Sequence, residues 1–495
     1  MLHPGYGEYQ GIQMRLVRHL FFAIIYAALG SAVILVGGYT YMLDARPDLK
    51  VWHQTVLDAE YTTGNDEVID FEDYLQLEDR LFDQLREQVY DRIDPADRRQ
   101  VIRYSAGSMM DPASFPKNWN RTFELAPDEP VGGVLLLHGL SDSPYSLRSL
   151  CELLYQRGYH VVGLRIPGHG TAPSGLLDAQ WEDWAAAVRI AATHVVEKAG
   201  PDQPLFVFGY SNGAALSVEY ALASLEQDNL PVPDGLVLLS PAIGVSSVAA
   251  FASWQARLGR LIGLDKLAWN SIELEFDPYK YGSFAVNAGD QIYQLTGRIG
   301  RGLEALKNAG RIDEFPGVLA FMSVVDATVP PSILIRVLFD RLADQGHQLV
   351  LFDVDRRAET QALLAHDPHQ RLEKLVGETN KTYDLTLVTN RYSDSRSVEA
   401  LFRLAGDSDI THDPLQLEWP TGVFSLSHVA LPFPPDDPLY GGPATEGKDY
   451  PWITLGNISI RGERNLLLFP DNYFLRLRYN PFHDYLTERV LGFMQ

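Results

Sequence analysis

The chain has 495 residues, a formal net charge of −23 and 46% hydrophobic residues. This length fits one large globular domain with insertions or two domains, and so acidic a surface argues against binding to nucleic acid phosphates. A single cysteine, Cys151, excludes an intramolecular disulfide, and its place on a predicted helix indicates a small core residue.

The first element is an apolar span, residues 20–43, which follows a short tail at 1–19 and contains no charged residue. As a helix it would extend about 36 Å, enough to cross a hydrocarbon core of about 30 Å. It is longer than the apolar region of a cleaved signal peptide, so the pattern predicts a single-pass signal anchor, with cleavage near residues 27–32 as the alternative. Basic residues are nearly balanced across the span, and the usual outcome for a short tail places the catalytic body on the non-cytoplasmic, periplasmic side.

A mostly acidic extension, residues 44–125, separates this span from the catalytic core. Apolar residues recur at helical spacing between residues 70 and 93, which predicts an amphipathic helix. We expect its apolar stripe to pack on the body of the enzyme, and docking of a partner is the alternative.

Short apolar runs alternate with helical patterns through residues 126–244 and again through 316–495. The runs are residues 134–137, 161–164, 205–208, 236–239, 318–322 and 349–352. Continuous apolar strands of this kind are typical of a mostly parallel sheet with helices on both faces, so the predicted fold class is α/β.

Residues 209–213 read Gly-Tyr-Ser-Asn-Gly, which fits the pattern G-x-S-x-G between a predicted strand and a predicted helix. A serine on such a sharp turn exposes its hydroxyl at the edge of the sheet, and the flanking glycines avoid clashes. Ser211 is therefore the predicted nucleophile. The backbone N–H groups of Asn212 and of Leu140, which follows His138-Gly139 at the end of an earlier strand, are the predicted oxyanion-hole donors.

Residues 245–315 interrupt the alternation and are predicted to form a helical cap over the carboxyl ends of the strands. The segment is rich in aromatic residues, namely Phe251, Trp254, Trp269, Tyr279, Tyr281 and Phe284. We expect it to shape the substrate pocket and exclude water.

A nucleophilic serine needs a histidine base and an acid, which on this type of sheet follow it in the order serine, acid, histidine. Asp326 follows the strand at 318–325 and is the predicted acid, while Asp353, after the next strand, is the alternative. His428 lies beyond both acids and is the predicted base. The weaker candidates are two histidines that precede the serine, and one on the terminal helix: His138, His169 and His483.

In these motifs the chain resembles the α/β-hydrolase superfamily, in particular its monoacylglycerol-lipase-like and serine-aminopeptidase-like branch. The residues that carry the resemblance are 138–140 (His-Gly-Leu), 165–171 (Arg-Ile-Pro-Gly-His-Gly-Thr), 209–213, Asp326 and His428. The resemblance implies acylation of Ser211 and release of the acid by water that the histidine activates. The interval of 102 residues between Asp326 and His428 exceeds that usual in the family, so an insertion is expected between them.

The sequence thus predicts a membrane-anchored serine hydrolase that cleaves carboxylic esters of lipid or acyl type. We expect no cofactor and no metal site, although His366, His369 and the pair at 436–437 are residue types that bind metals. An acyltransferase with the same acyl-serine, an aminopeptidase and an inactive hydrolase-fold binding module are the alternatives. The sequence leaves the substrate and the oligomeric state open.

Overall fold

The computed structural model describes residues 18–27, 29–31, 37–38, 45–244, 264–362, 364, 381–458 and 475–495. Among the helices of these segments, none combines the length and the apolar character that a membrane crossing requires. The predicted span at 20–43 lies partly outside the described residues. So do most of the tail at 1–19, the first part of the predicted cap (with Phe251 and Trp254), and both His366 and His369.

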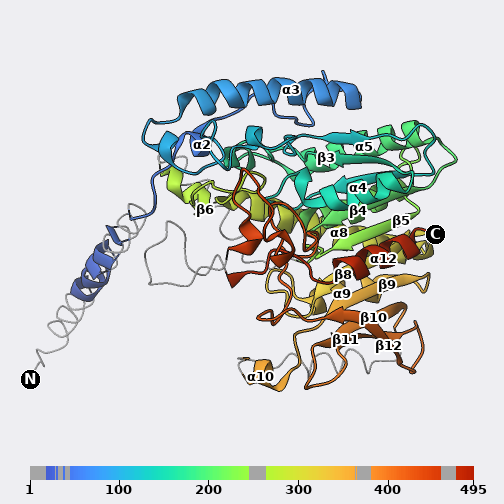
Figure 1. Ribbon diagram of the computed structural model, residues 1–495. Coiled ribbons are helices and arrows are strands. Elements are labelled where there is room, and N and C mark those ends of the chain that lie inside the picture. Colours follow the sequence, from blue (N-terminus) through green and yellow to red (C-terminus); the bar gives the residue numbers. More distant parts are fainter. Residues whose placement is uncertain are drawn as a thin grey trace, which may run out of the picture.

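A ten-stranded sheet occupies the centre of the described molecule, in the order β1-β3-β2-β4-β5-β8-β9-β10-β11-β12 (Figure 1). The strands are β1 (Phe123–Leu125), β2 (Gly133–Leu137), β3 (His160–Leu164), β4 (Leu205–Tyr210), β5 (Gly235–Leu239), β8 (Gly317–Ser323), β9 (His347–Phe352), β10 (Tyr383–Asn390), β11 (Ser397–Arg403) and β12 (Thr411–Glu418). Neighbours from β3 to β10 run parallel, while β1, β11 and β12 pair antiparallel. The prediction of a mostly parallel α/β sheet is therefore confirmed.

Both faces of the sheet are buried because successive side chains of a strand point to opposite sides. In β2, Val134 and Leu136 pack in the cluster that includes Cys151, while Leu135 and Leu137 pack in the opposite cluster. Helices α4 (Arg148–Gln156) and α12 (His483–Phe493) cover the first face, and α5 (Trp181–Ala199), α6 (Asn212–Glu226) and α8 (Val286–Asn308) cover the second. The burial of Cys151 agrees with the predicted core role.

The amphipathic helix of the extension is α3 (Phe71–Gln88), which lies along the outside of the helical layer (Figure 1). Asp70 caps it by accepting a hydrogen bond from the Asp73 N–H. The Tyr74 hydroxyl donates to the Arg165 carbonyl over 2.6 Å, and the Arg165 guanidinium pairs with Glu78 over 2.9 Å. The extension is therefore attached to the body through the buried arginine of the 165–171 motif.

Several shorter helices complete the described regular structure. They are α2 (Val51–Gln54), α9 (Pro331–Val337) and α10 (Ala358–Gln361).

The predicted cap ends earlier than the sequence indicated. Residues 264–285 contain the short antiparallel pair β6 (Trp269–Ser271) and β7 (Phe284–Ala285), and the long helix α8 then packs against α6 in the layer over the sheet. Since β5 and β8 are parallel neighbours, a crossover helix must join them, and α8 provides it. The helical part of 286–308 therefore belongs to the body and not to a cap.

The long interval between Asp326 and His428 is filled by β9 and by the added strands β10, β11 and β12, which extend the sheet at one edge. The chain then returns to the end of β9, where Val354 forms a bridge with Ser425 and the Asp355 N–H donates to the Phe424 carbonyl over 2.9 Å. The expected insertion thus consists, in the described residues, of three strands added to the side of the sheet. It leaves the acid and the histidine together at the carboxyl ends of the strands.

Candidate active site

Ser211 stands on a strained turn between β4 and α6. Its backbone has φ 55° and ψ −111°, an unusual conformation for a residue with a side chain. The turn is held from both sides, because the Ser211 N–H donates to the Leu239 carbonyl over 2.9 Å and its carbonyl accepts from the Ala242 N–H over 3.0 Å. The hydroxyl is therefore fixed at the carboxyl edge of the sheet.

The two glycines of the motif make this turn possible. A Cβ on Gly213 would overlap the carbonyl of Leu137 in β2, and a Cβ on Gly209 would overlap the backbone of Ala214. Both contacts are with backbone atoms, which cannot move without displacing β2 or α6. The sequence motif thus reflects the close approach of a strand and a helix.

The structure brings the three predicted catalytic side chains together. His428 Nε2 lies 3.0 Å from Ser211 Oγ, and His428 Nδ1 lies 2.7 Å from Asp326 Oδ2. The other oxygen of Asp326 accepts hydrogen bonds from the N–H groups of Thr328 and Val329. Asp326 is thus held in place to accept a hydrogen bond from His428 Nδ1, which orients the ring with Nε2 toward the serine hydroxyl.

The alternative acid, Asp353, has other partners. Its two oxygens form a bidentate ion pair with Arg356 at 2.8 Å, and it also accepts a hydrogen bond from the Thr389 hydroxyl. It follows β9, which lies one strand further from β4 than β8 does. Since each strand adds about 4.8 Å, Asp326 rather than Asp353 reaches the histidine.

Two backbone donors face the same edge of the sheet as Ser211. Within the described residues, the N–H groups of Leu140 and Asn212 have no hydrogen-bond acceptor, and Asn212 is the first residue of α6. His138 fixes the loop that carries Leu140, since its Nδ1 lies 2.8 Å from the Gly139 carbonyl and its Nε2 accepts from the Ile166 N–H over 3.0 Å. Burial lowers the pKa of His138 well below its usual range, which keeps this ring neutral.

The remaining candidate histidines have structural environments. His169 Nδ1 lies 3.0 Å from the Pro167 carbonyl, and burial lowers the pKa of this ring. His483 is buried at the start of α12, and burial lowers its pKa to about 4. Neither shares the contacts with a serine and a carboxylate that His428 makes.

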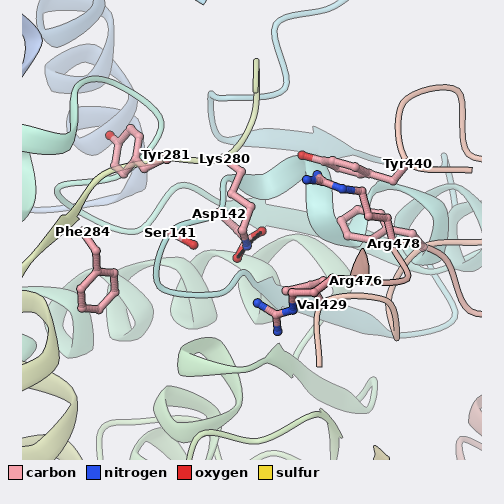
Figure 2. A pocket seen from close by; sticks show the side chains of 11 residues that line it. Ser141, Asp142, Lys280, Tyr281, Phe284, Val429, Tyr440, Arg476 and Arg478 are labelled. Atoms are coloured by element: carbon pink, nitrogen blue, oxygen red, sulfur yellow. Dashed lines mark hydrogen bonds and ion pairs between the residues drawn. The ribbon is translucent and has the colours of Figure 1, made fainter. Parts of the chain in front are cut away.

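A cavity of about 190 Å³ is lined by Ser141, directly after Leu140, and by Val429, directly after His428. Its apolar wall is formed by Tyr281, Phe284, Val429, Phe433 and Tyr440. Figure 2 shows three basic side chains around the same space, of which Lys280 contacts Asp142 over 2.9 Å. Arg478 lies 3.6 Å from the buried Asp277, whereas Arg476 has no carboxylate partner among the described residues.

Sequence reasoning missed several of these groups. Arg476, Lys280 and Asp142 lie in loops far apart in the chain, and no pattern connects them. Ser240 is another such residue: it has φ 45°, and its hydroxyl donates to the His428 carbonyl over 3.3 Å. The one feature of the sequence that could have indicated Ser240 is its position directly after the strand at 236–239. Potential metal ligands in the described residues gather away from the triad, around Glu124.

Comparison with known proteins finds similarity in the part of the chain that carries Ser211. Residues 128–280 match the family model described as serine aminopeptidase, S33. The chain is 31% identical over 137 residues to a thermostable monoacylglycerol lipase of Bacillus sp. (strain H-257). The aligned segment makes up 28% of this chain and 51% of that relative. The chain is 28% identical over 120 residues to phospholipase YtpA of Bacillus subtilis (strain 168), which covers 24% of this chain and 43% of the relative.

The chain therefore spans about half the length of the curated relatives that it matches. Among solved structures, a monoacylglycerol lipase from Paleococcus ferrophilus is 23% identical and covers 47% of this chain and 88% of that one, with a TM-score of 0.34. The sheet order, the strained serine turn and the matched segment together identify an α/β-hydrolase fold that resembles ester hydrolases.

Proposed function

We propose that this protein is a serine-dependent carboxylic ester hydrolase that acts through an acyl-serine intermediate. The observation that carries the proposal is the continuous contact from Ser211 Oγ through His428 to Asp326, at 3.0 and 2.7 Å. The strained backbone of Ser211 supports the same chemistry, as do the N–H groups of Leu140 and Asn212, which have no acceptor among the described residues.

In this mechanism His428 Nε2 takes the proton of Ser211 as Oγ attacks the acyl carbonyl. Asp326 stabilises the imidazolium that forms, and the N–H groups of Leu140 and Asn212 stabilise the oxyanion of the tetrahedral intermediate. Collapse of the intermediate breaks the ester bond, and His428 returns the proton to the leaving alcohol. Water activated by the same histidine then hydrolyses the acyl-serine and releases the acid.

The substrates we propose are lipid or acyl esters. The aromatic and aliphatic wall of the cavity supports an apolar substrate portion, and the names of the two curated relatives point to the same class. Arg476, which lines the cavity and has no carboxylate partner among the described residues, favours an anionic group near the scissile ester. We expect a lysophospholipid to be hydrolysed with a several-fold higher kcat/KM than the monoacylglycerol with the same acyl chain. Arg476→Gln should reduce that ratio, and an unchanged ratio would remove the anionic group from the proposal.

We also propose that residues 20–43 anchor the protein in a membrane, with the catalytic domain on the non-cytoplasmic side. In support, apolar side chains of the described helical stretch are exposed, among them Leu20, Phe21 and Ile24.

The full chain should remain in the membrane pellet after alkaline extraction, whereas a chain that starts at residue 44 should not. A reporter fused after residue 495 should give a non-cytoplasmic signal, and a cytoplasmic signal would reverse the proposed orientation.

Labelling with a fluorophosphonate tests the enzyme proposal directly. The wild type should be labelled and Ser211→Ala should not. Ser224→Ala is a matched control, because this serine also lies on α6 and its hydroxyl donates to the Ala221 carbonyl. A wild type that resists labelling would contradict the proposal, and labelling that survives Ser211→Ala would move the nucleophile elsewhere. Measuring acyl transfer to added alcohol against hydrolysis then separates a hydrolase from an acyltransferase.

A further inference from the structure

Three potential metal ligands from three different elements meet at the amino end of β3. They are Glu124 of β1, His160 at the start of β3 and His194 near the end of α5. The triad lies at the opposite, carboxyl end of the strands, so this cluster is separate from the proposed catalytic site. Figure 1 shows β3 and α5 side by side at this part of the sheet.

The strand register explains why the three side chains converge. Glu124 is paired with Val162, and His160 lies two residues before Val162, so both side chains point to the same face of the sheet. Helix α5 covers that face and runs back toward the amino ends of the strands, which brings His194 over the pair. Phe71 of α3 stacks on the His194 ring with centroids 4.2 Å apart.

The distances are close to those of a coordination shell. The Nε2 atoms of His160 and His194 each lie 2.9 Å from the same oxygen of Glu124, and the three ligand atoms lie within 4.8 Å of one another. Zinc bonds of about 2.0–2.2 Å in a tetrahedron separate ligand atoms by about 3.3 Å. The two nitrogens therefore need to approach each other by at most about 1.5 Å, which rotation of the half-buried His194 can provide.

The chemical state of the ligands also suits a cation. His160 is only 2% exposed, and its Nε2 approaches Glu124 without hydrogen-bond geometry, so this buried nitrogen has no hydrogen-bond partner in the described part of the chain. Glu124 is 31% exposed, which leaves a path for an ion and a water molecule.

We propose that Glu124, His160 and His194 bind one divalent transition-metal ion, with zinc favoured by the two imidazoles and one carboxylate. A water molecule would complete the coordination, as is common for sites with three protein ligands. Bound there, the ion joins the edge strand β1 to β3 and α5 and stabilises this corner of the fold. The role is structural and does not depend on the proposed ester hydrolysis.

The test uses the full chain without a polyhistidine tag, stripped with EDTA and dialysed at pH 7.5. Titration calorimetry with Zn²⁺ should show one site per chain, and Zn²⁺ should raise the Tm. Co²⁺ should bind with the intense visible absorption bands of a low-coordinate site. Glu124→Gln and His194→Gln should each weaken Zn²⁺ binding at least tenfold and abolish the cobalt bands. His412→Gln is the matched control, because His412 contacts a single carboxylate, Glu399, over 3.2 Å.

Fluorophosphonate labelling of Ser211 in each variant reports whether the fold is intact, so loss of metal binding in a labelled variant is a specific effect. Absence of stoichiometric binding to the wild type would overturn the proposal and leave two histidines that share one carboxylate. Binding that persists in both Glu124→Gln and His194→Gln would also overturn it. Neither result would affect the hydrolase proposal, which depends on the labelling of Ser211 alone.

Discussion

Two groups of histidine and carboxylate side chains lie at opposite ends of the strands, the triad at the carboxyl end and the Glu124 cluster at the amino end, and they are built differently. At the carboxyl end, His428 has an acid on one nitrogen and a hydroxyl on the other. At the amino end, two imidazoles face one oxygen of Glu124. The first arrangement can transfer a proton between the serine hydroxyl and the histidine, while the second places three potential metal ligands around one point.

The backbones that carry the two groups differ as well. The triad stands on turns that follow strands, and Ser211 has a strained conformation. Glu124, His160 and His194 stand on regular strands and a helix, whose backbones are held by hydrogen bonds. This difference suggests that the first group supports a reaction and the second supports the fold.

The largest effect should follow from removing the nucleophile or its base. Ser211→Ala and His428→Ala should each reduce kcat by about 10⁶, because the two residues act as one unit. For the same reason the double variant should be no slower than either single one. Steady-state hydrolysis of a short-chain nitrophenyl ester measures this. Additive losses in the double variant would contradict the coupled roles.

Removing the acid should cost less. Asp326→Asn should reduce kcat by about 10⁴, because the amide cannot hold the imidazole in the same tautomer. Asp353→Asn is the matched comparison, since it breaks the ion pair with Arg356 but does not touch His428. It should lower the Tm and leave the pH dependence of kcat unchanged. A larger loss of kcat in Asp353→Asn than in Asp326→Asn would exchange the two assignments.

These two acids also show how far the sequence could predict the site. The strand–turn–helix pattern around Ser211 and the required chain order were sufficient to select the nucleophile and the base. Asp326 and Asp353 both follow apolar strands, so only the strand order in space separates them. That order depends on which strands pair across long distances, and no local pattern encodes it.

The amino-end cluster was beyond prediction for a related reason. Glu124, His160 and His194 are separated by tens of residues, have no motif spacing, and meet only because β1 pairs antiparallel with β3 under α5. In the same way, α8 was assigned to a cap because the sequence does not reveal that β5 and β8 are neighbours. The local elements were predictable, whereas the contacts between distant elements were not.

A third kind of histidine environment gives a pH prediction. His347, at the start of β9, is 1% exposed, and neither ring nitrogen has a hydrogen-bond partner in the described segments. Burial lowers its pKa from 6.5 to about 4. The unfolded chain therefore binds a proton that the folded chain excludes, so stability is full above pH 6.5 and falls as the pH drops toward 4.

We expect this histidine to account for a loss of about 3 kcal/mol in the free energy of unfolding across that window. Urea unfolding at pH 7 and pH 4.5 measures it. In His347→Leu the difference between the two pH values should shrink by this amount, while the exposed His412→Gln should leave it unchanged. An equal pH dependence in His347→Leu and the wild type would contradict the assignment.

The smallest effect should come from Glu124 in protein stripped of metal. Its pKa is lowered by the His160 and His194 rings, so the carboxylate stabilises the fold above its ordinary value of about 4.5 and loses that effect as the pH falls. Because the side chain is partly exposed, Glu124→Gln should cost less than about 1 kcal/mol at pH 7. Glu67→Gln, which breaks an exposed pair with Arg80, is the control and should cost still less. Zn²⁺ should then raise the Tm of the wild type and leave the Tm of Glu124→Gln and of His194→Gln unchanged. That result would mean that the amino-end group stabilises the fold mainly through the bound ion, unlike the triad at the other end.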